Sequence, residues 1–295
     1  MLNRPILISS IALLLLSGSL VLSSFDDARA SVRKPFKVVI DPGHGGSDHG
    51  ATVRIGGREI TEKDLTLLLA LAAKQALTKR GYQVFLTRTR DQDVPLSLRT
   101  ALANRLKADL FISIHMNSHK TPRPGDARGV ETYIVNTTSN EMSRRLAYLE
   151  NTTNRPNLPE IKIQTDDGRR MSADGQEDVA LILKDLTIGA NLSESKRLAC
   201  LLQSQLVAAS APTGHSPASA NRGVKQALFH VLLGADMPSA LVEAGFINHP
   251  QDRSHVVYDR ERARLADGIA SAVDLFRTQK DTRLAAISLS TCQVR

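Results

Sequence analysis

Short apolar runs and longer stretches with helical spacing alternate along most of the chain. Runs rich in β-branched residues predict buried strands, and apolar positions that recur every three to four residues predict helices. We expect strands at residues 36–41, 83–87, 109–115, 129–135, 229–232 and 240–243. We expect helices at residues 62–79, 95–107, 139–150, 176–190, 193–209 and 259–278, with Thr61 as the N-cap of the first. This succession predicts an α/β fold with a mainly parallel sheet.

The first thirty residues predict a signal peptide. A short polar start precedes the apolar stretch 6–22, and Ala28-Arg29-Ala30 offers a cleavage site before Ser31. We therefore expect an exported protein without a membrane span after cleavage; a retained membrane anchor is the alternative. Residues 31–278 then form one catalytic domain, followed by a loose tail at 279–295.

Composition adds few constraints. The chain is 42% hydrophobic and 23% charged, as in ordinary globular proteins, and its net charge is +8. A polyanionic partner such as the cell wall would suit this charge, although solubility explains it equally well. No compact Lys/Arg block appears, so nucleic acid is not an expected partner. A disulfide between Cys200 and Cys292 is permitted in an exported protein but is not required, and the apolar helical run around Cys200 favours a core position.

Two histidines stand at the carboxyl ends of predicted buried strands, where α/β sheets bind ligands. His44 lies in a glycine-rich loop after the first strand, and His115 ends the strand 109–115. Glu62 begins the helix that follows the His44 loop. Two imidazoles and one carboxylate compose the open zinc site of a hydrolase, with a fourth position for water.

A further carboxylate, Glu243, ends the apolar strand 240–243. An unpaired carboxylate there would be costly unless it served chemistry, so Glu243 is the candidate base. Structural explanations exist for each residue alone. Backbone groups could satisfy His115, an arginine could pair with Glu243, and Glu62 could complement its helix N-terminus by about 0.3–1 kcal/mol.

Five ordered motifs carry a resemblance to a known family. They read IDPGHGGSDHGA, EKDLTLLLA, ANRLKADLFISIHMNS, GVETYIV and PSALVEAGFINHPQD. Over residues 36–277 the chain resembles zinc-dependent N-acetylmuramoyl-L-alanine amidases of the cell wall. The resemblance implies a twisted, mostly parallel sheet flanked by helices, with one Zn²⁺ held by His44, Glu62 and His115. It also implies Glu243 as the catalytic glutamate.

The implied reaction is hydrolysis of the amide between N-acetylmuramic acid and L-alanine in peptidoglycan, during wall remodelling and daughter-cell separation. The implied location is the periplasm, with secretion to the wall as the alternative. A zinc carboxypeptidase-like peptidase is the alternative enzyme. The alternative without chemistry is a wall-binding protein on the same fold.

One spacing departs from the family pattern. The metal-binding glutamate usually follows the first histidine by about fifteen residues, which would select Glu59, whereas Glu62 lies eighteen residues after His44. The match of Glu62-Lys63-Asp64-Leu65 favours Glu62 and a loop insertion of three residues. Asn117 and Glu131 match family positions near the site and are expected to orient ligands or substrate. The remaining histidines considered are not expected to be ligands: His49, His119 and His230.

Residues 139–192 resemble the inserted region of the cell-separation branch of this family. The resemblance implies an autoinhibitory helix that lies across the zinc cleft until an activator protein withdraws it. Glu150, Glu177 and Asp185 all remain candidates for the blocking acidic residue. A surface helical hairpin is the alternative.

Overall fold

The computed structural model describes residues 34–119, 127–152, 163–164, 170–171, 174–210, 221–278, 292 and 294, with the backbone alone at 163–164, 170–171 and 174–190. The predicted signal peptide lies outside the described residues, as do much of the predicted insertion and most of the predicted tail. Among the helices that the structure describes, none is long and apolar enough to cross a membrane.

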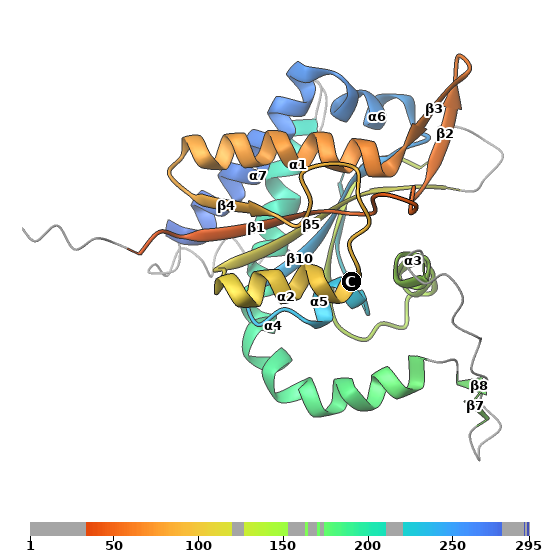
Figure 1. Cartoon of the computed structure of the whole chain (residues 1–295), viewed down its shortest axis with the longest axis vertical. Coiled ribbons are helices and arrows are strands. Elements are labelled where there is room, and N and C mark those ends of the chain that lie inside the picture. The colour runs from red at the N-terminus through yellow and green to blue at the C-terminus, as the bar shows by residue number, and fades with distance from the viewer. Residues whose placement is uncertain are drawn as a thin grey trace, which may run out of the picture. The chain divides into compact units, whose positions relative to one another are not determined.

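Six strands form one sheet in the order β4-β1-β5-β10-β6-β9 (Figure 1). Neighbouring strands run parallel except β10 and β6, which are antiparallel. The predicted α/β fold with a mostly parallel sheet is therefore confirmed. The strands are β1 (Lys37–Pro42), β4 (Gln83–Leu86), β5 (Leu110–Asn117), β6 (Val130–Val135), β9 (Asn221–Ala227) and β10 (Ser239–Phe246). Two separate hairpins pair β2 (Thr52–Ile55) with β3 (Arg58–Thr61), and β7 (Ile163–Gln164) with β8 (Arg170–Met171).

Helices cover both faces of the sheet (Figure 1). They are α1 (Glu62–Lys79), α2 (Leu96–Leu106), α3 (Glu141–Thr152), α4 (Asp174–Ser210), α5 (His230–Leu233), α6 (Pro250–Val257) and α7 (Asp259–Thr278). The apolar residues of α1, α4 and α7 pack on one face, and those of α2 and α5 pack on the other.

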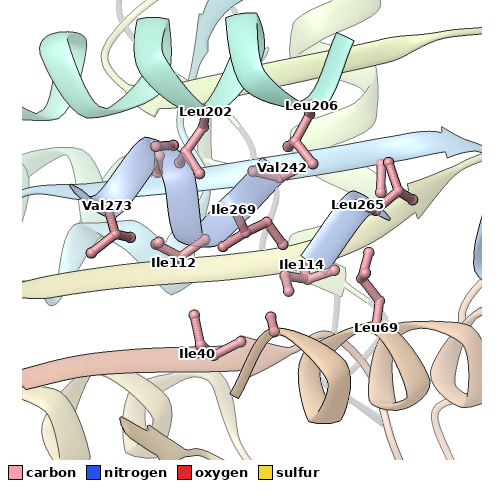
Figure 2. Packing of buried hydrophobic residues seen from close by; sticks show 14 of the residues in the cluster. Ile40, Leu69, Ile112, Ile114, Leu202, Leu206, Val242, Leu265, Ile269 and Val273 are labelled. Atoms are coloured by element: carbon pink, nitrogen blue, oxygen red, sulfur yellow. The ribbon is translucent and has the colours of Figure 1, made fainter. Parts of the chain in front are cut away.

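The alternation of side chains along the central strands divides the core into these two layers. Ile112 and Ile114 of β5 point toward the α1, α4 and α7 layer, where they meet side chains such as Leu69 and Ile269 (Figure 2). Phe111, the residue before Ile112, belongs to the opposite layer. Because the central strands are buried on both faces, their sequences are continuous apolar runs, which is why the pattern predicts them well.

Three predicted elements are wrong in detail. The predicted strand 229–232 is instead Phe229 followed by the short helix α5. The strand that precedes β10 is instead β9, which begins in the predicted link 210–222. β9 is an edge strand that contains Arg222, Gly223 and Lys225, so it lacks the continuous apolar run of a central strand. The helices predicted at 176–190 and 193–209 are one helix, α4, because an interior glycine such as Gly189 costs only about 1 kcal/mol and does not end a helix.

A disulfide bond joins Cys200 of α4 to Cys292. The two cysteines are 92 residues apart in sequence. Val294, two residues after Cys292, forms a β-bridge with Val224 of β9. The question that the sequence leaves open is thereby answered, since Cys200 is both buried in the core and bonded. The chain is therefore held to the domain at this point of the predicted tail.

Candidate metal centre

Four side chains converge at the carboxyl ends of β1 and β5: His44, Glu62, His115 and Glu150. Oε1 of Glu62 lies 3.0 Å from Nε2 of His44 and 3.2 Å from Nδ1 of His115. Oε2 of Glu150 lies 3.2 Å and 3.1 Å from the same two nitrogens. The structure thus brings together the three ligands predicted from the sequence and adds Glu150, one of the three acidic residues considered in the insertion.

Neighbouring elements place the first three residues. β1 and β5 are adjacent and parallel, so the loop after β1 and the end of β5 meet at one edge. The hydroxyl of Thr61 accepts a hydrogen bond from the backbone of Asp64, which confirms the predicted N-cap and starts α1 at Glu62. Backbone N–H groups of Met116 and Ala51 donate to the two oxygens of Glu62 at 2.9 Å each. The Glu62 carboxylate is therefore held in place.

Glycines give the histidine rings room. A Cβ atom at Gly43 would lie 2.4 Å from the ring of His115. At Gly50 it would lie 2.7 Å from both Oε2 of Glu62 and Cδ2 of His44, and the φ of +64° there also favours glycine. Larger residues at these positions would displace the candidate ligands.

A buried ion pair fixes the backbone of the His44 loop. His44 itself has a φ of +60°, a conformation that costs free energy for a residue with a side chain. Arg99 donates to the carbonyl oxygens of Pro42 at 2.8 Å and His44 at 3.0 Å, and it pairs with Asp41 at 2.8 Å. Burial raises the pKa of Asp41, but the Arg99 guanidinium and the hydroxyls of Thr87 and Ser113 together hold it below its ordinary value.

A second buried arginine, Arg88, holds the loop from the α1 side. It donates to the carbonyl oxygens of Pro42, Gly43 and Lys63. Sequence reasoning missed both Arg88 and Arg99, because an arginine inside a core is recognisable only once its carbonyl partners are known. The acidic Asp41 directly before the Pro-Gly-His turn was the available signal.

The imidazole of His44 is oriented by Asp48. Oδ2 of Asp48 lies 3.0 Å from Nδ1 of His44, so a proton on Nδ1 leaves Nε2 free of hydrogen and directed at the cluster. Burial lowers the pKa of His115, but the Glu150 and Glu62 carboxylates outweigh it and raise that pKa to about 10. Two carboxylates facing two buried imidazoles therefore favour a positive charge at their centre.

The donor set fits a metal ion. Imidazole nitrogen and carboxylate oxygen are zinc ligands, and atoms about 2.0–2.1 Å from a tetrahedral zinc ion lie roughly 3.3 Å from one another. The nitrogen–oxygen distances of 3.0–3.2 Å in the cluster are close to that separation. Nε2 of His44, although buried, makes no hydrogen bond with the part of the chain that the structure describes. A cation among these atoms would satisfy it.

Glu243 lies beside this cluster on β10. In the sheet it is paired with His115 on one side and Glu131 on the other. It is fully buried, and neither carboxylate oxygen has a hydrogen-bond partner among the described residues. Burial raises the pKa of Glu243 well above its ordinary value, and the Glu150, Glu62 and Glu131 carboxylates add to this against the opposing effect of His115. Such a group is suited to accepting and releasing a proton.

A groove of about 390 Å³ lies between α3 and residues of β5, β6, β9 and β10, among them Asn117, Arg222 and Phe246. Glu131 lies in its wall and accepts hydrogen bonds from Arg222, Lys225, Tyr133 and Asn117. The predicted orienting residues Asn117 and Glu131 are thus in contact with each other. The sequence did not indicate Arg222 and Lys225, because β9 was not expected there.

The other residues considered from the sequence lie outside the cluster. Glu59 is exposed on the β2–β3 hairpin, and His49 is also exposed. His119 and His230 are not members of the cluster. The side chains of the two other acidic residues proposed for the insertion, Glu177 and Asp185, lie outside the described residues.

Comparisons with known proteins show what the chain is similar to. The family model described as N-acetylmuramoyl-L-alanine amidase matches residues 38–274. The amidase AmiC of Neisseria meningitidis is 33% identical over 244 residues, which are 83% of this chain and 53% of that protein. AmiA of Escherichia coli K12 is 30% identical over 80% of this chain and 74% of that protein. The chain spans about half the length of the first curated relatives it matches, 53% and 54%.

Solved structures are similar over the same region. An N-acetylmuramoyl-L-alanine amidase from Clostridium difficile 630 has a TM-score of 0.57 and 28% sequence identity, covering 83% of this chain and 98% of that chain. The amidase AmiC2 of Nostoc punctiforme has a TM-score of 0.55 and 26% identity, covering 82% and 97%.

Proposed function

The chain belongs to the N-acetylmuramoyl-L-alanine amidase family, and from this premise we propose that it hydrolyses the amide bond between N-acetylmuramic acid and L-alanine in peptidoglycan, with one zinc ion. The observation that carries the proposal is the pairing of Glu243, a buried carboxyl with no hydrogen-bond partner among the described residues, with the adjacent His44–Glu62–His115 cluster. A metal site and a base are the two components that water-dependent amide hydrolysis requires.

The roles of the residues follow from their positions. His44, Glu62 and His115 would hold the ion, which when bound supplies a Lewis acid and a more acidic water molecule. Glu243 would take the proton from the attacking water, while the oxygen adds to the lactyl carbonyl carbon. The protonated Glu243 would then deliver that proton to the departing alanine nitrogen as the C–N bond breaks. Its raised pKa suits the first step, because a stronger base accepts a proton more readily.

We assign the blocking role in the proposed autoinhibition to Glu150. Its Oε2 atom lies 3.2 Å from Nε2 of His44 and 3.1 Å from Nδ1 of His115, so it occupies a position among the candidate ligands that a substrate oxygen would need. The next residue, Asn151, donates to the carbonyl of Leu228 and accepts from the N–H of His230, both at 2.8 Å, which holds the end of α3 in this position. Substrate access would therefore require α3 to move.

An activator protein is the proposed cause of that movement. Only Ser143 and Ala147 of α3 are buried, so little apolar packing opposes its release. Met142 and Tyr148 on the same helix are 60% and 57% exposed, which leaves apolar surface for a partner. The proposed location outside the cytoplasm is supported by the signal-peptide pattern and by the Cys200–Cys292 disulfide, which forms in oxidising compartments.

Digestion of purified peptidoglycan tests the reaction. The mature chain and its Glu150→Ala variant are incubated with intact sacculi, with and without a chelator, and the products are identified by mass spectrometry. We expect free stem peptides with new alanine amino termini, more from Glu150→Ala, and none after chelation until zinc is returned. Release of single C-terminal amino acids would instead indicate a carboxypeptidase. No product together with no stoichiometric zinc would indicate a non-catalytic wall-binding protein.

A further inference from the structure

We propose that Arg222 and Lys225 of β9 recognise a carboxylate of the stem peptide, namely the free α-carboxylate of the γ-linked glutamate next to the alanine that is released. This inference rests on the proposed amidase function and adds a specificity-determining contact to it. It starts from the groove of about 390 Å³ whose wall contains Glu131, the residue opposite the proposed base Glu243 in the sheet.

Glu131 holds the two cations at the groove. Its Oε1 accepts hydrogen bonds from Nε of Arg222 and, at 2.9 Å, from Nζ of Lys225. Its Oε2 accepts from the hydroxyl of Tyr133 at 2.6 Å and from the amide of Asn117 at 3.3 Å. The Glu131 side chain is only 3% exposed, and each of its oxygens accepts two hydrogen bonds. Two positive charges share one negative charge here.

Arg222 keeps an open hydrogen-bonding edge. Nε is engaged by Glu131, and the carbon of its guanidinium lies 5.0 Å from the centroid of the Phe246 ring. Its two terminal amino groups make no hydrogen bond with any residue that the structure describes, and the side chain is 35% exposed. A guanidinium fixed along one edge and supported by an aromatic ring presents two parallel donors on its other edge. This is the arrangement that binds a carboxylate through two hydrogen bonds.

The position of the pair selects the substrate group. Glu131 of β6 is directly opposite Glu243 in the β6–β10 register, and the cations on β9 lie two strands along the sheet from the base, on the other side of β6. Glu243 does not neutralise them, since its oxygens form no hydrogen bond with described residues. A stem peptide whose first amide bond lies at Glu243 would bring the carboxylate of its second residue into this groove. A stem peptide in which the α-carboxyl of this second residue is amidated lacks that negative charge.

Arg145 adds a third cation to the groove but belongs to the helix that carries Glu150. Because substrate entry requires α3 to move, Arg145 leaves the groove together with this helix. Arg222 and Lys225 stay, since β9 is paired with β6 in the sheet. The recognition site therefore consists of sheet residues and becomes accessible when the helix is displaced.

Peptide binding to the full mature chain tests the inference. Calorimetric titrations use zinc-loaded Glu150→Ala protein and three tripeptides, L-alanyl-γ-D-glutamyl-L-lysine, its isoglutamine analogue and its C-terminal amide. We expect the first and third peptides to bind about tenfold more tightly than the isoglutamine peptide. Arg222→Gln should remove this preference, and Arg222→Lys should retain part of it. Arg58→Gln, on the exposed β2–β3 hairpin, is the matched control and should retain all of it.

The outcomes separate this inference from the proposed reaction. Equal binding of the acid and isoglutamine peptides, or a preference that survives Arg222→Gln, would overturn the recognition site whether or not peptidoglycan is cleaved. If the peptide with the amidated C-terminus binds more weakly and the isoglutamine peptide does not, the recognised carboxylate is the C-terminal one. That result would overturn the assignment to the second residue. A preference for the acid peptide that depends on Arg222 would support the recognition site. This holds even if the digestion of sacculi shows no amide cleavage, because that result would contradict the proposed reaction alone.

Discussion

Oε2 of Glu150 lies 3.2 Å from Nε2 of His44, although the two residues are far apart in sequence and belong to a helix and a strand-end loop. The same nitrogen is the one that Asp48 leaves free for a metal. The proposed blocking residue and the first candidate ligand are thus parts of one cluster. Any oxygen of water or substrate that is to bind at this position has to replace the Glu150 carboxylate.

Removing this carboxylate should activate the enzyme. A charge-assisted hydrogen bond contributes about 1.5–3 kcal/mol, so Glu150→Ala should raise basal release of stem peptides by roughly ten- to a hundredfold. Glu141→Ala, an exposed change on the same helix, is the control and should leave the basal rate unchanged. The rate is measured with labelled sacculi. Equal rates for Glu150→Ala and Glu141→Ala would rule out Glu150 as the block.

The two glutamates near the first helix should differ in metal binding. Glu62→Gln should release zinc from the mature protein, because it removes an anionic ligand that contacts both imidazoles. Glu59→Gln should retain one zinc ion per chain, since Glu59 is exposed on β3. Elemental analysis after dialysis against a weak chelator measures both. Loss of zinc in Glu59→Gln with retention in Glu62→Gln would reverse the ligand assignment.

The sequence predicts the central parts of this molecule better than its edges. β1, β5 and β10 are recognisable because burial on both faces makes them continuous apolar runs. β9 is an edge strand with a mixed sequence, and the four residues of α5 are too few to show a helical period. The strand predicted at 229–232 is wrong because the short apolar run there belongs to Phe229 and α5.

The candidate site shows the same division. The closeness of His44, Glu62, His115 and Glu243 was predictable because each stands near the end of an apolar strand or at a helix start, where local patterns are strong. The contribution of Glu150 depends on how α3 lies against the sheet, which is a long-range property without a local signal. Arg222 requires in addition the position of β9 beside β6.

Glu243→Gln should strongly lower turnover without loss of zinc or stability. Losing a general base lowers the rate by about 10²–10⁴-fold. Because burial penalises the charged carboxylate, the neutral amide should leave the melting temperature of the zinc-free protein unchanged or higher. Peptidoglycan digestion, elemental analysis and calorimetry provide the three measurements. A Glu243→Gln protein that contains zinc and remains active would exclude Glu243 as the base.

The Asp41–Arg99 pair should make the fold depend on pH on the acid side. Asp41→Asn leaves Arg99 buried without its counter-charge, which costs about 3–5 kcal/mol in the free energy of unfolding at neutral pH. The folded-state pKa of Asp41 lies below its ordinary value of 3.8, so its stabilising effect is complete above that value and is lost as the pH falls through the lowered pKa. The difference in unfolding free energy between the unmodified chain and Asp41→Asn should therefore be constant from pH 7 to about 5 and shrink below 3.8. Urea unfolding of both proteins across this range measures it, with the exposed change Asp236→Asn as control. A difference that stays constant down to the acid unfolding of both proteins would show that the ionised form of Asp41 does not hold the His44 loop.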